Sequence, residues 1–241
     1  MTFEGEVLKS AFGKAAVDHY EWQTQAAGVA ERERELVQSA FQPLGKRLLD
    51  LGCGEGATLF HLGEPAGATG VDLFPEKIEF ARRRLPKCRF EVGSVYELPF
   101  GDRAFDHVLV RDVIHHLDAP ARFVAEAARV LDVGGRLDVL EPCCYNPLIF
   151  AHALAVRAER GELRSNSTFL RELLAPKFEV TVVETFQGLP LHRLLFHPDL
   201  GRPQWGHGGL VKQLADRVEK LADRIVPRWA RAYIHLRAQK R

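Results

Sequence analysis

Short apolar runs alternate with amphipathic segments through the middle of the chain. The runs that predict β-strands cover residues 46–51, 68–72, 88–92, 105–110 and 136–141. Patterns with helical spacing lie between them, at 56–62, 75–85 and 119–131. Alternation of this kind predicts parallel strands with helices on both faces of the sheet. We therefore expect an α/β domain.

The flanking segments have patterns of their own. A polar helical segment is predicted over 11–40, a capped helix over Ser167–Leu174, a sixth strand over 178–184 and a closing strand over 233–239. Residues 142–163 fit neither a tight loop nor a standard crossover. Residues 187–209 are rich in Gly, Pro and His and predict an irregular loop. An apolar stripe with helical spacing follows, and we expect it to pack against the core or as a lid: Leu210, Leu214, Val218, Leu221 and Ile225.

Composition narrows the class of protein. The 241 residues are 46% hydrophobic, and 33 Lys and Arg balance 32 Asp and Glu, so bulk charge favours neither nucleic acid nor a membrane. No apolar run approaches the ~20 residues that span a bilayer, and the first ten residues have no signal-peptide core. The chain is predicted to be cytoplasmic, with no membrane span and no nucleic-acid partner, while its oligomeric state stays open.

Cysteine and histidine spacing encodes no metal site that we recognise. The four cysteines form no C-x-x-C pair. His192, His197 and His207 share the 187–209 segment, but no carboxylate or cysteine joins them at ligand spacing. A surface loop is therefore the favoured interpretation, and no metal is predicted.

The most informative stretch runs from Arg47 to Gly56, where an apolar strand leads into a glycine-rich turn and then a helix. Glycines let the backbone turn tightly and let a ligand approach the main chain. About 20 residues later, Asp72 ends the next strand with a carboxylate that suits ribose hydroxyls. Asp72 as a helix N-cap before Pro75 is the alternative. Together these features predict a site for an adenosine-containing cofactor.

Asp50 distinguishes between two cofactor classes. A dinucleotide places its pyrophosphate over the first turn and helix N-terminus, where a carboxylate on the strand end would repel it. Two unit charges 4 Å apart interact by about 4 kcal/mol at an effective dielectric of ~20. A cofactor with an ammonium and a sulfonium group would instead be attracted, and S-adenosylmethionine is such a cofactor.

Five sequence blocks resemble the class I methyltransferases of the small-molecule "type 11" group. They are LLDLGCGEGATL, GVDLF, GSVYELPF, FDHVLVRDVIHHL and ARVLDVGGRLDVLEP, between residues 48 and 142. The resemblance implies a Rossmann-like, doubly wound seven-stranded sheet in the order 3-2-1-4-5-7-6, with strand 7 antiparallel and helices on both faces. It implies one domain over 1–241, with cap helices in 1–45, the cofactor-binding core in 46–141 and substrate-covering insertions at 142–165 and 187–230.

The resemblance also implies which residues contact S-adenosylmethionine. The methionine part is surrounded by Asp50, Gly52, Cys53 and Gly54, while Asp72 holds the ribose and Leu73 flanks the adenine. The block at Gly93, Ser94 and Val95 departs from the family, which usually has Gly-Asp there; the Ser94 hydroxyl can still accept a bond from the adenine amino group. Arg111 and His116 would line the cofactor cleft, and Tyr20 belongs to a segment similar to the family's capping helix.

The acceptor side is less defined by the sequence. His115 and His116 follow the fourth strand, where an imidazole can take a proton from a substrate hydroxyl or amine. Glu141 and Tyr145 could orient a nucleophile, and all four could equally be structural. Apolar residues of the two insertions predict a small apolar or aromatic acceptor: Leu148, Phe150, Leu154, Leu191 and Phe196.

The predicted reaction is direct displacement by an acceptor O, N, C or S atom on the sulfonium methyl group. Three alternatives stay open. One is carboxyl O-methylation of an acyl carrier-bound substrate, which needs a basic docking face near the cleft. A second is a nicotinamide dehydrogenase, which Asp50 argues against. A third is a non-catalytic relative that binds the cofactor only as a structural or regulatory ligand.

Overall fold

One seven-stranded sheet organises the computed structural model, which describes residues 17–197 and 201–241. Its strand order is β3-β2-β1-β4-β5-β7-β6. β7 runs antiparallel to both of its neighbours, and the other pairs are parallel. This confirms the predicted order and the antiparallel seventh strand. The strands are β1 (Leu48–Leu51), β2 (Thr69–Asp72), β3 (Arg89–Val92), β4 (Phe105–Arg111), β5 (Leu131–Pro142), β6 (Phe178–Phe186) and β7 (Tyr233–Lys240).

Helices cover both faces of the sheet, each with its own apolar core. On one face, α6 (Pro120–Val130) and α8 (Ser167–Leu174) contribute Phe123 and Leu170 to the buried cluster over β4, β5 and β7. On the other face, α3 (Ala30–Phe41), α4 (Ala57–His61) and α5 (Pro75–Arg84) pack on β1 and β3. Both faces of the parallel strands are therefore dry, which explains their continuous apolar runs.

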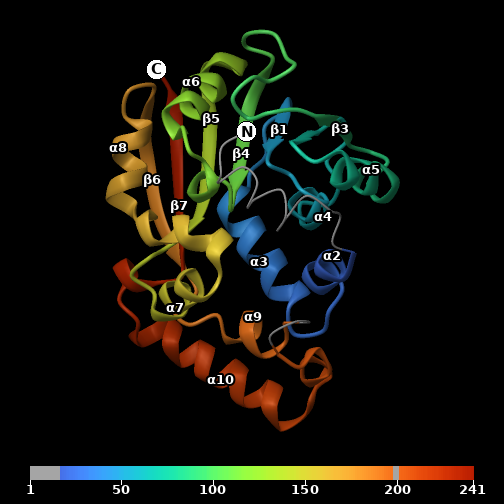
Figure 1. Ribbon diagram of the computed structural model, residues 1–241, viewed down its shortest axis with the longest axis vertical. Helices are drawn as coiled ribbons and strands as arrows, with labels where there is room; N and C mark the ends of the chain where they lie inside the picture. The colour runs from blue at the N-terminus through green and yellow to red at the C-terminus, as the bar shows by residue number, and fades with distance from the viewer. Residues whose placement is uncertain (1–16, 198–200) are drawn as a thin grey trace.

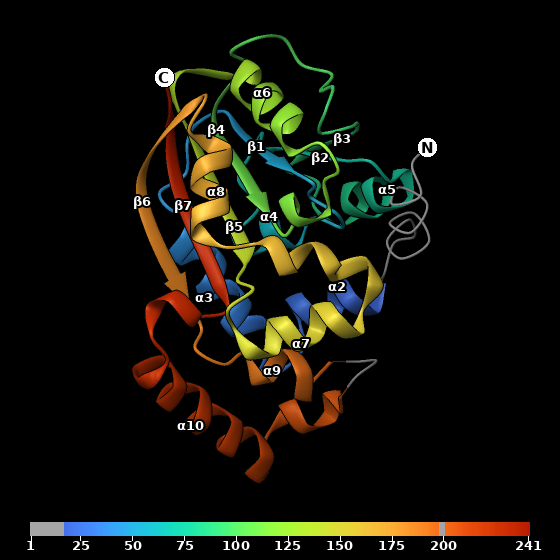
Figure 2. The same cartoon turned by 60° about the vertical axis from the view of Figure 1, so that its left-hand side comes forward.

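Further segments lie beyond the carboxyl ends of β4 and β5 (Figures 1 and 2). They include α7 (Pro147–Ala155), η2 (Arg157–Arg164), α9 (Leu191–Leu195), η3 (Pro203–His207), α10 (Gly209–Ile225) and η4 (Arg228–Ala230). The fully buried Asn146 ties three of them together: its side chain caps α7 at Leu148 N and donates to Gly188 O and Ala230 O. The two predicted insertions are thus joined through one amide.

Two predictions about the flanking segments were wrong. The polar segment predicted as one helix over 11–40 is two helices, α2 (Val17–Thr24) and α3, separated at Gly28, whose φ of 80° no ordinary helix has; residues 11–16 lie outside the described part. The 187–209 segment holds α9 and η3 instead of being wholly irregular. His192 is not on a surface loop, because it is 1% exposed and bonded to Glu219.

The apolar stripe of α10 was also predicted wrongly. All five of its members are exposed, from 44% for Val218 to 71% for Leu210. The helix rests on the molecule through Ala215, Glu219 and Ala222 instead. Figure 1 shows α10 at the bottom of the view, with α9 between it and α3. No helix among the described residues is both long and apolar enough to cross a bilayer.

We expect the two apolar sites to differ sharply in their effect on stability. Phe123→Ala empties a fully buried position and should lower the free energy of unfolding by about 3–5 kcal/mol. Leu221→Ala on the exposed stripe should change it by less than about 0.5 kcal/mol. Urea unfolding at low protein concentration measures both. A loss of more than about 2 kcal/mol in Leu221→Ala would contradict the exposure of α10.

Candidate functional site

The glycine-rich turn after β1 has the backbone shape that the sequence predicted. Gly52 and Gly54 have φ angles of 72° and 53°, in the left-handed region. The amides of Gly52 and Cys53 both donate to Val71 O, at 2.8 and 3.0 Å, which fixes the turn against β2. A Cβ on Gly52 would lie 2.4 Å from Val113 Cγ2. Glycine is therefore required at residue 52 by conformation and by space.

Asp50 is a buried carboxyl group at the centre of the sheet, paired in register with Gly70 of β2 and Leu109 of β4. It is 1% exposed, and its Oδ2 has no hydrogen-bond partner among the described residues. Burial raises the pKa of this carboxyl to about 7, against the attraction of Arg111. An unsatisfied buried carboxylate beside an open glycine turn fits a ligand that brings a cationic donor.

Asp72 ends β2 and faces the same turn. Its Oδ2 accepts the Gly54 amide at 2.9 Å and its Oδ1 accepts the Phe74 amide at 3.0 Å. The N-cap residue of α5 is Phe74, so Asp72 is not that helix's N-cap. Burial raises the pKa of Asp72, although these two amides and Lys77 lower it. Each carboxylate oxygen keeps a lone pair for a ligand hydroxyl, and Leu73 beside it is 60% exposed.

Three other predicted cofactor contacts surround the turn in different ways. Cys53 is buried, and burial raises the pKa of its thiol well above the usual value. The Ser94 hydroxyl accepts the Tyr96 amide at 3.2 Å, which shapes the segment after β3. Val95 is partly buried against the core. The structure therefore places Ser94 and Val95 at the carboxyl end of β3, next to β2.

Arg111 is engaged by the cap helices. It pairs with the fully buried Glu33 of α3 and, at 3.3 Å, with Asp112. Arg193 of α9 approaches the same Glu33 carboxylate at 2.9 and 3.0 Å. Burial alone would raise the pKa of Glu33, but the two arginines hold it well below its usual value. Sequence reasoning missed Glu33 and Arg193, since the carboxylate lies 160 residues from Arg193.

Tyr20 packs inward from α2. It is 3% exposed, and its ring makes edge contacts with Phe60 and Phe80, with centroids 6.1 and 5.1 Å apart. These contacts bring α2 onto α4 and α5, the helices that follow the first two strands. The similar segment at 12–16 lies outside the described residues.

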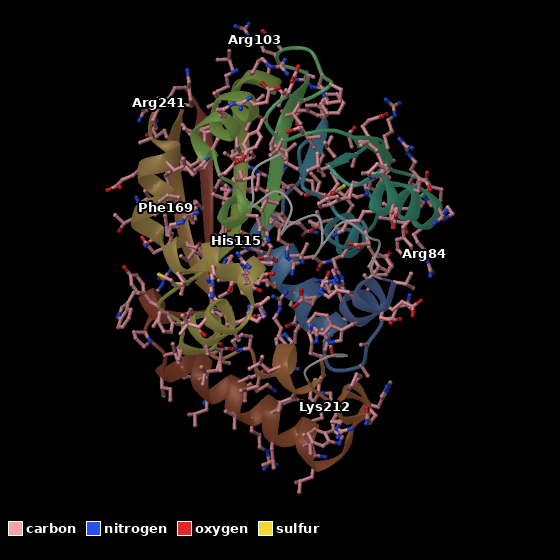
Figure 3. The ribbon with its side chains drawn as sticks, in the orientation of Figure 1. Arg84, Arg103, His115, Phe169, Lys212 and Arg241 are labelled. Carbon is pink, nitrogen blue, oxygen red and sulfur yellow. The ribbon has the colours of Figure 1, made fainter. Side chains whose placement is uncertain are left out.

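His115 is locked between two carboxylates. Its Nδ1 lies 2.7 Å from Glu141 Oε2 and its Nε2 lies 3.2 Å from Glu159 Oε2. Burial alone would lower its pKa, but the two glutamates raise it well above the usual value. Glu141 also accepts the amides of Val113 and Ile114, at 2.7 and 2.8 Å. These contacts give both residues a positioning role, and Figure 3 labels His115 near the middle of the molecule.

His116 and Tyr145 have different surroundings. The His116 side chain is 19% exposed, its Nε2 lies 3.7 Å from Glu159 Oε2, and burial lowers its pKa to about 4. Tyr145 is 54% exposed and lies against Trp229, with ring centroids 6.0 Å apart. It lines a cavity of about 360 Å³ with Cys143 and Arg228 that contains none of the other predicted site residues. Glu159, which sequence reasoning missed, joins His115 and His116.

The predicted apolar acceptor pocket is only partly present. Phe196 is fully buried in a small core with Trp22 and Val29, so it supports the cap instead of lining a pocket. Phe150 and Leu154, one turn apart on α7, are 48% and 56% exposed. Leu148 and Leu191 are partly buried.

The chain matches known methyltransferases through its central segment. The family model described as a methyltransferase domain covers residues 49–139. The phthiotriol/phenolphthiotriol dimycocerosates methyltransferase of Mycobacterium leprae is 39% identical over 98 residues, which are 39% of this chain and 36% of that protein. The 27-O-demethylrifamycin SV methyltransferase of Amycolatopsis mediterranei is 32% identical over 131 residues, 49% and 48% of the two chains. The chain thus spans about half or less of these relatives.

A solved structure is similar over almost the whole chain. A possible histamine N-methyltransferase from Thermotoga maritima, described as dependent on S-adenosylmethionine, aligns with a TM-score of 0.67, 21% identity and coverage of 99% of this chain and 100% of that one. At this identity the likeness shows the fold.

Asp50→Asn should stabilise the free protein above neutral pH. The raised pKa means that the folded state resists ionisation, so stability is lost as the pH rises from about 4 to about 7. Removing the charge should raise the free energy of unfolding by about 1–3 kcal/mol at pH 8, and by little at pH 4. Urea unfolding at both pH values, without ligand, measures this. Asp102→Asn, on a 74% exposed side chain, is the control. A less stable Asn variant at pH 8 would refute the reasoning.

Proposed function

Since this chain belongs to the class I S-adenosylmethionine-dependent methyltransferases, we propose that it transfers a methyl group from S-adenosylmethionine to a small organic acceptor. One observation carries the proposal: Asp50 is buried beside the glycine turn with an oxygen that has no hydrogen-bond partner. A cationic amino-acid tail satisfies that oxygen, whereas a pyrophosphate would be repelled.

The residues at the strand ends divide the binding of the cofactor among themselves. Asp50 and the backbone of Gly52 and Gly54 hold the methionine part, and Asp72 accepts the ribose hydroxyls. Leu73 offers an exposed apolar side chain to the adenine, and the Ser94 segment lies on its other side. When bound, the cofactor supplies a methyl group on a positively charged sulfur.

The remaining task of the chain is positioning. Glu33 holds Arg111 and Arg193, and therefore α3 and α9, against the end of β4. Tyr20 holds α2 on the helices that follow the glycine turn. These contacts build walls around the reacting atoms, where orientation and exclusion of water accelerate a displacement. His115 and Glu141 support the wall from below, and His116 is the histidine we place closer to the acceptor.

An apolar acceptor is supported by α7 and by the relatives. Phe150 and Leu154 present apolar surface on a helix beyond the strand ends. The names of the two relatives describe methyl transfer to a lipid and to a rifamycin. We therefore propose a lipid-like, aromatic or polyketide-like acceptor.

A second candidate is methylation of an acyl carrier-bound carboxyl group. One observation favours it: η2 exposes Arg157, Arg160 and Arg164 beyond the strand ends. An acidic carrier protein would be attracted to such a face. A non-catalytic relative would bind the cofactor but form no S-adenosylhomocysteine with any acceptor of a broad panel, and a dehydrogenase would bind NAD instead.

Asp72→Ala should weaken S-adenosylmethionine binding. The substitution removes a charge-assisted contact worth about 1.5–3 kcal/mol, which corresponds to about 10–150-fold in Kd. Isothermal calorimetry with S-adenosylmethionine and, separately, with NAD measures it, and Asp102→Ala serves as the control. Unchanged affinity would remove Asp72 from the site. Tight NAD binding without S-adenosylmethionine binding would overturn the proposed function.

The carrier hypothesis has its own test. If a carrier docks on η2, Arg160→Glu should raise KM for a carrier-bound carboxylic acid about fivefold, the effect of about 1 kcal/mol per exposed charge pair. The free acid should be used equally well by the variant and the unchanged protein. Equal KM values for the carrier-bound acid would reject docking on this face.

A further inference from the structure

A cluster of histidines and glutamates joins the end of β4 to the segment after β5. Glu159 Oε2 of η2 lies 3.2 Å from His115 Nε2 and 3.7 Å from His116 Nε2, both in η1 (Ile114–His116). One ligand atom from each of these three residues lies within 4.8 Å of the others. Two imidazoles and a carboxylate form a donor set that suits a divalent transition metal.

The spacing of these atoms is close to that of a coordination shell. Metal–ligand bonds of about 2.0–2.2 Å in a tetrahedron place neighbouring ligand atoms about 3.3–3.6 Å apart. The distances from Glu159 Oε2 to the two histidines, 3.2 and 3.7 Å, bracket that range. A small rotation of His116 would bring the three atoms around one ion.

Glu141 orients His115 as a second-shell carboxylate orients a metal-bound histidine. It lies 2.7 Å from His115 Nδ1 and is itself held by the amides of Val113, Ile114 and His115. With the Nδ1 proton directed at Glu141, Nε2 is the atom presented to Glu159. A carboxylate–histidine pair of this kind fixes the tautomer and increases ligand basicity.

The backbone holds the two short helices together. An added Cβ on Gly161 would lie 1.6 Å from His115 O, so η2 rests directly on η1 at this point. Two residues earlier in the chain, Glu159 is thereby delivered to the histidines. The 15% and 19% exposure of the Glu159 and His116 side chains leaves a route by which an ion can enter.

We propose that His115, His116 and Glu159 bind a divalent transition-metal ion such as Zn²⁺, Mn²⁺, Fe²⁺ or Co²⁺. The ion takes the place of the proton between His115 Nε2 and Glu159 Oε2, and that proton passes to solvent. Three protein ligands leave coordination positions for water or for an oxygen of an acceptor. The inference rests on these contacts alone and does not depend on methyl transfer. The rival explanation is a set of ion pairs without metal.

Titration with Co²⁺ tests the proposal. The full chain, without a polyhistidine tag, is freed of metal with a chelator and titrated with CoCl₂ by calorimetry and visible absorption. We expect one Co²⁺ per chain, with d–d bands of a nitrogen- and oxygen-ligated site. Glu159→Gln and His116→Gln should each weaken binding at least about tenfold, the lower end of the cost for disturbing a metal's ligand shell.

Matched controls lie in the same cluster. Glu162→Gln and His152→Gln alter a neighbouring pair, 3.3 Å apart, that lies outside the three proposed ligands. Both controls should bind Co²⁺ within about threefold of the unchanged protein. Circular dichroism of every variant checks the fold, and a change of metal affinity counts only in folded variants. Absence of Co²⁺ binding by the unchanged protein at millimolar concentration, or equal affinity in folded Glu159→Gln or His116→Gln, would overturn the proposal in favour of simple ion pairs.

Discussion

The buried carboxyl group of Asp50 is the constraint around which the site is built. Its position in the central strand removes it from water, and one of its oxygens has no hydrogen bond among the described residues. An arrangement of this kind is costly for the free protein and favourable only with a cationic partner in place. The glycine turn is the complement of that carboxylate, because it keeps side chains away from the space where the partner must sit. Stability is thus given up at the position where binding is to be strongest.

A second set of buried charges attaches the cap to this core. Glu33 of α3 gathers Arg111 from the sheet and Arg193 from α9, while Glu219 of α10 gathers His192 and Arg32. Each carboxylate therefore links segments that are far apart in the sequence. Removing one partner of such a buried cluster is expected to cost much more than its net contribution to stability. The cap therefore depends on matched charges more than on apolar burial, which agrees with the small size of the Trp22 and Phe196 core.

The sheet could be predicted from the sequence because local patterns encode it. Apolar strands such as Leu48–Leu51 and turn glycines such as Gly52 are recognisable within ten residues, and the strand order followed from the family resemblance. The cap and the acceptor side could not be predicted in this way. The stripe from Leu210 to Ile225 has helical spacing, but spacing does not reveal whether a face meets protein or solvent. The partners of His115 and His192 are likewise set by tertiary contacts, since Glu159 and Glu219 lie 44 and 27 residues away.

The boundary of the family match has a consequence for specificity. It ends at residue 139, before Glu141, α7 and η2, and long before α9 and α10. The segment shared with known methyltransferases therefore contains the glycine turn, Asp50 and Asp72, whereas most of the residues around the proposed acceptor site lie outside it. His115 and His116 fall within the match, but the carboxylates that position them do not. Two proteins can share the matched segment and still surround the same histidines differently, so the acceptor is determined by the 142–164 and 187–230 segments rather than by the motifs that identify the family.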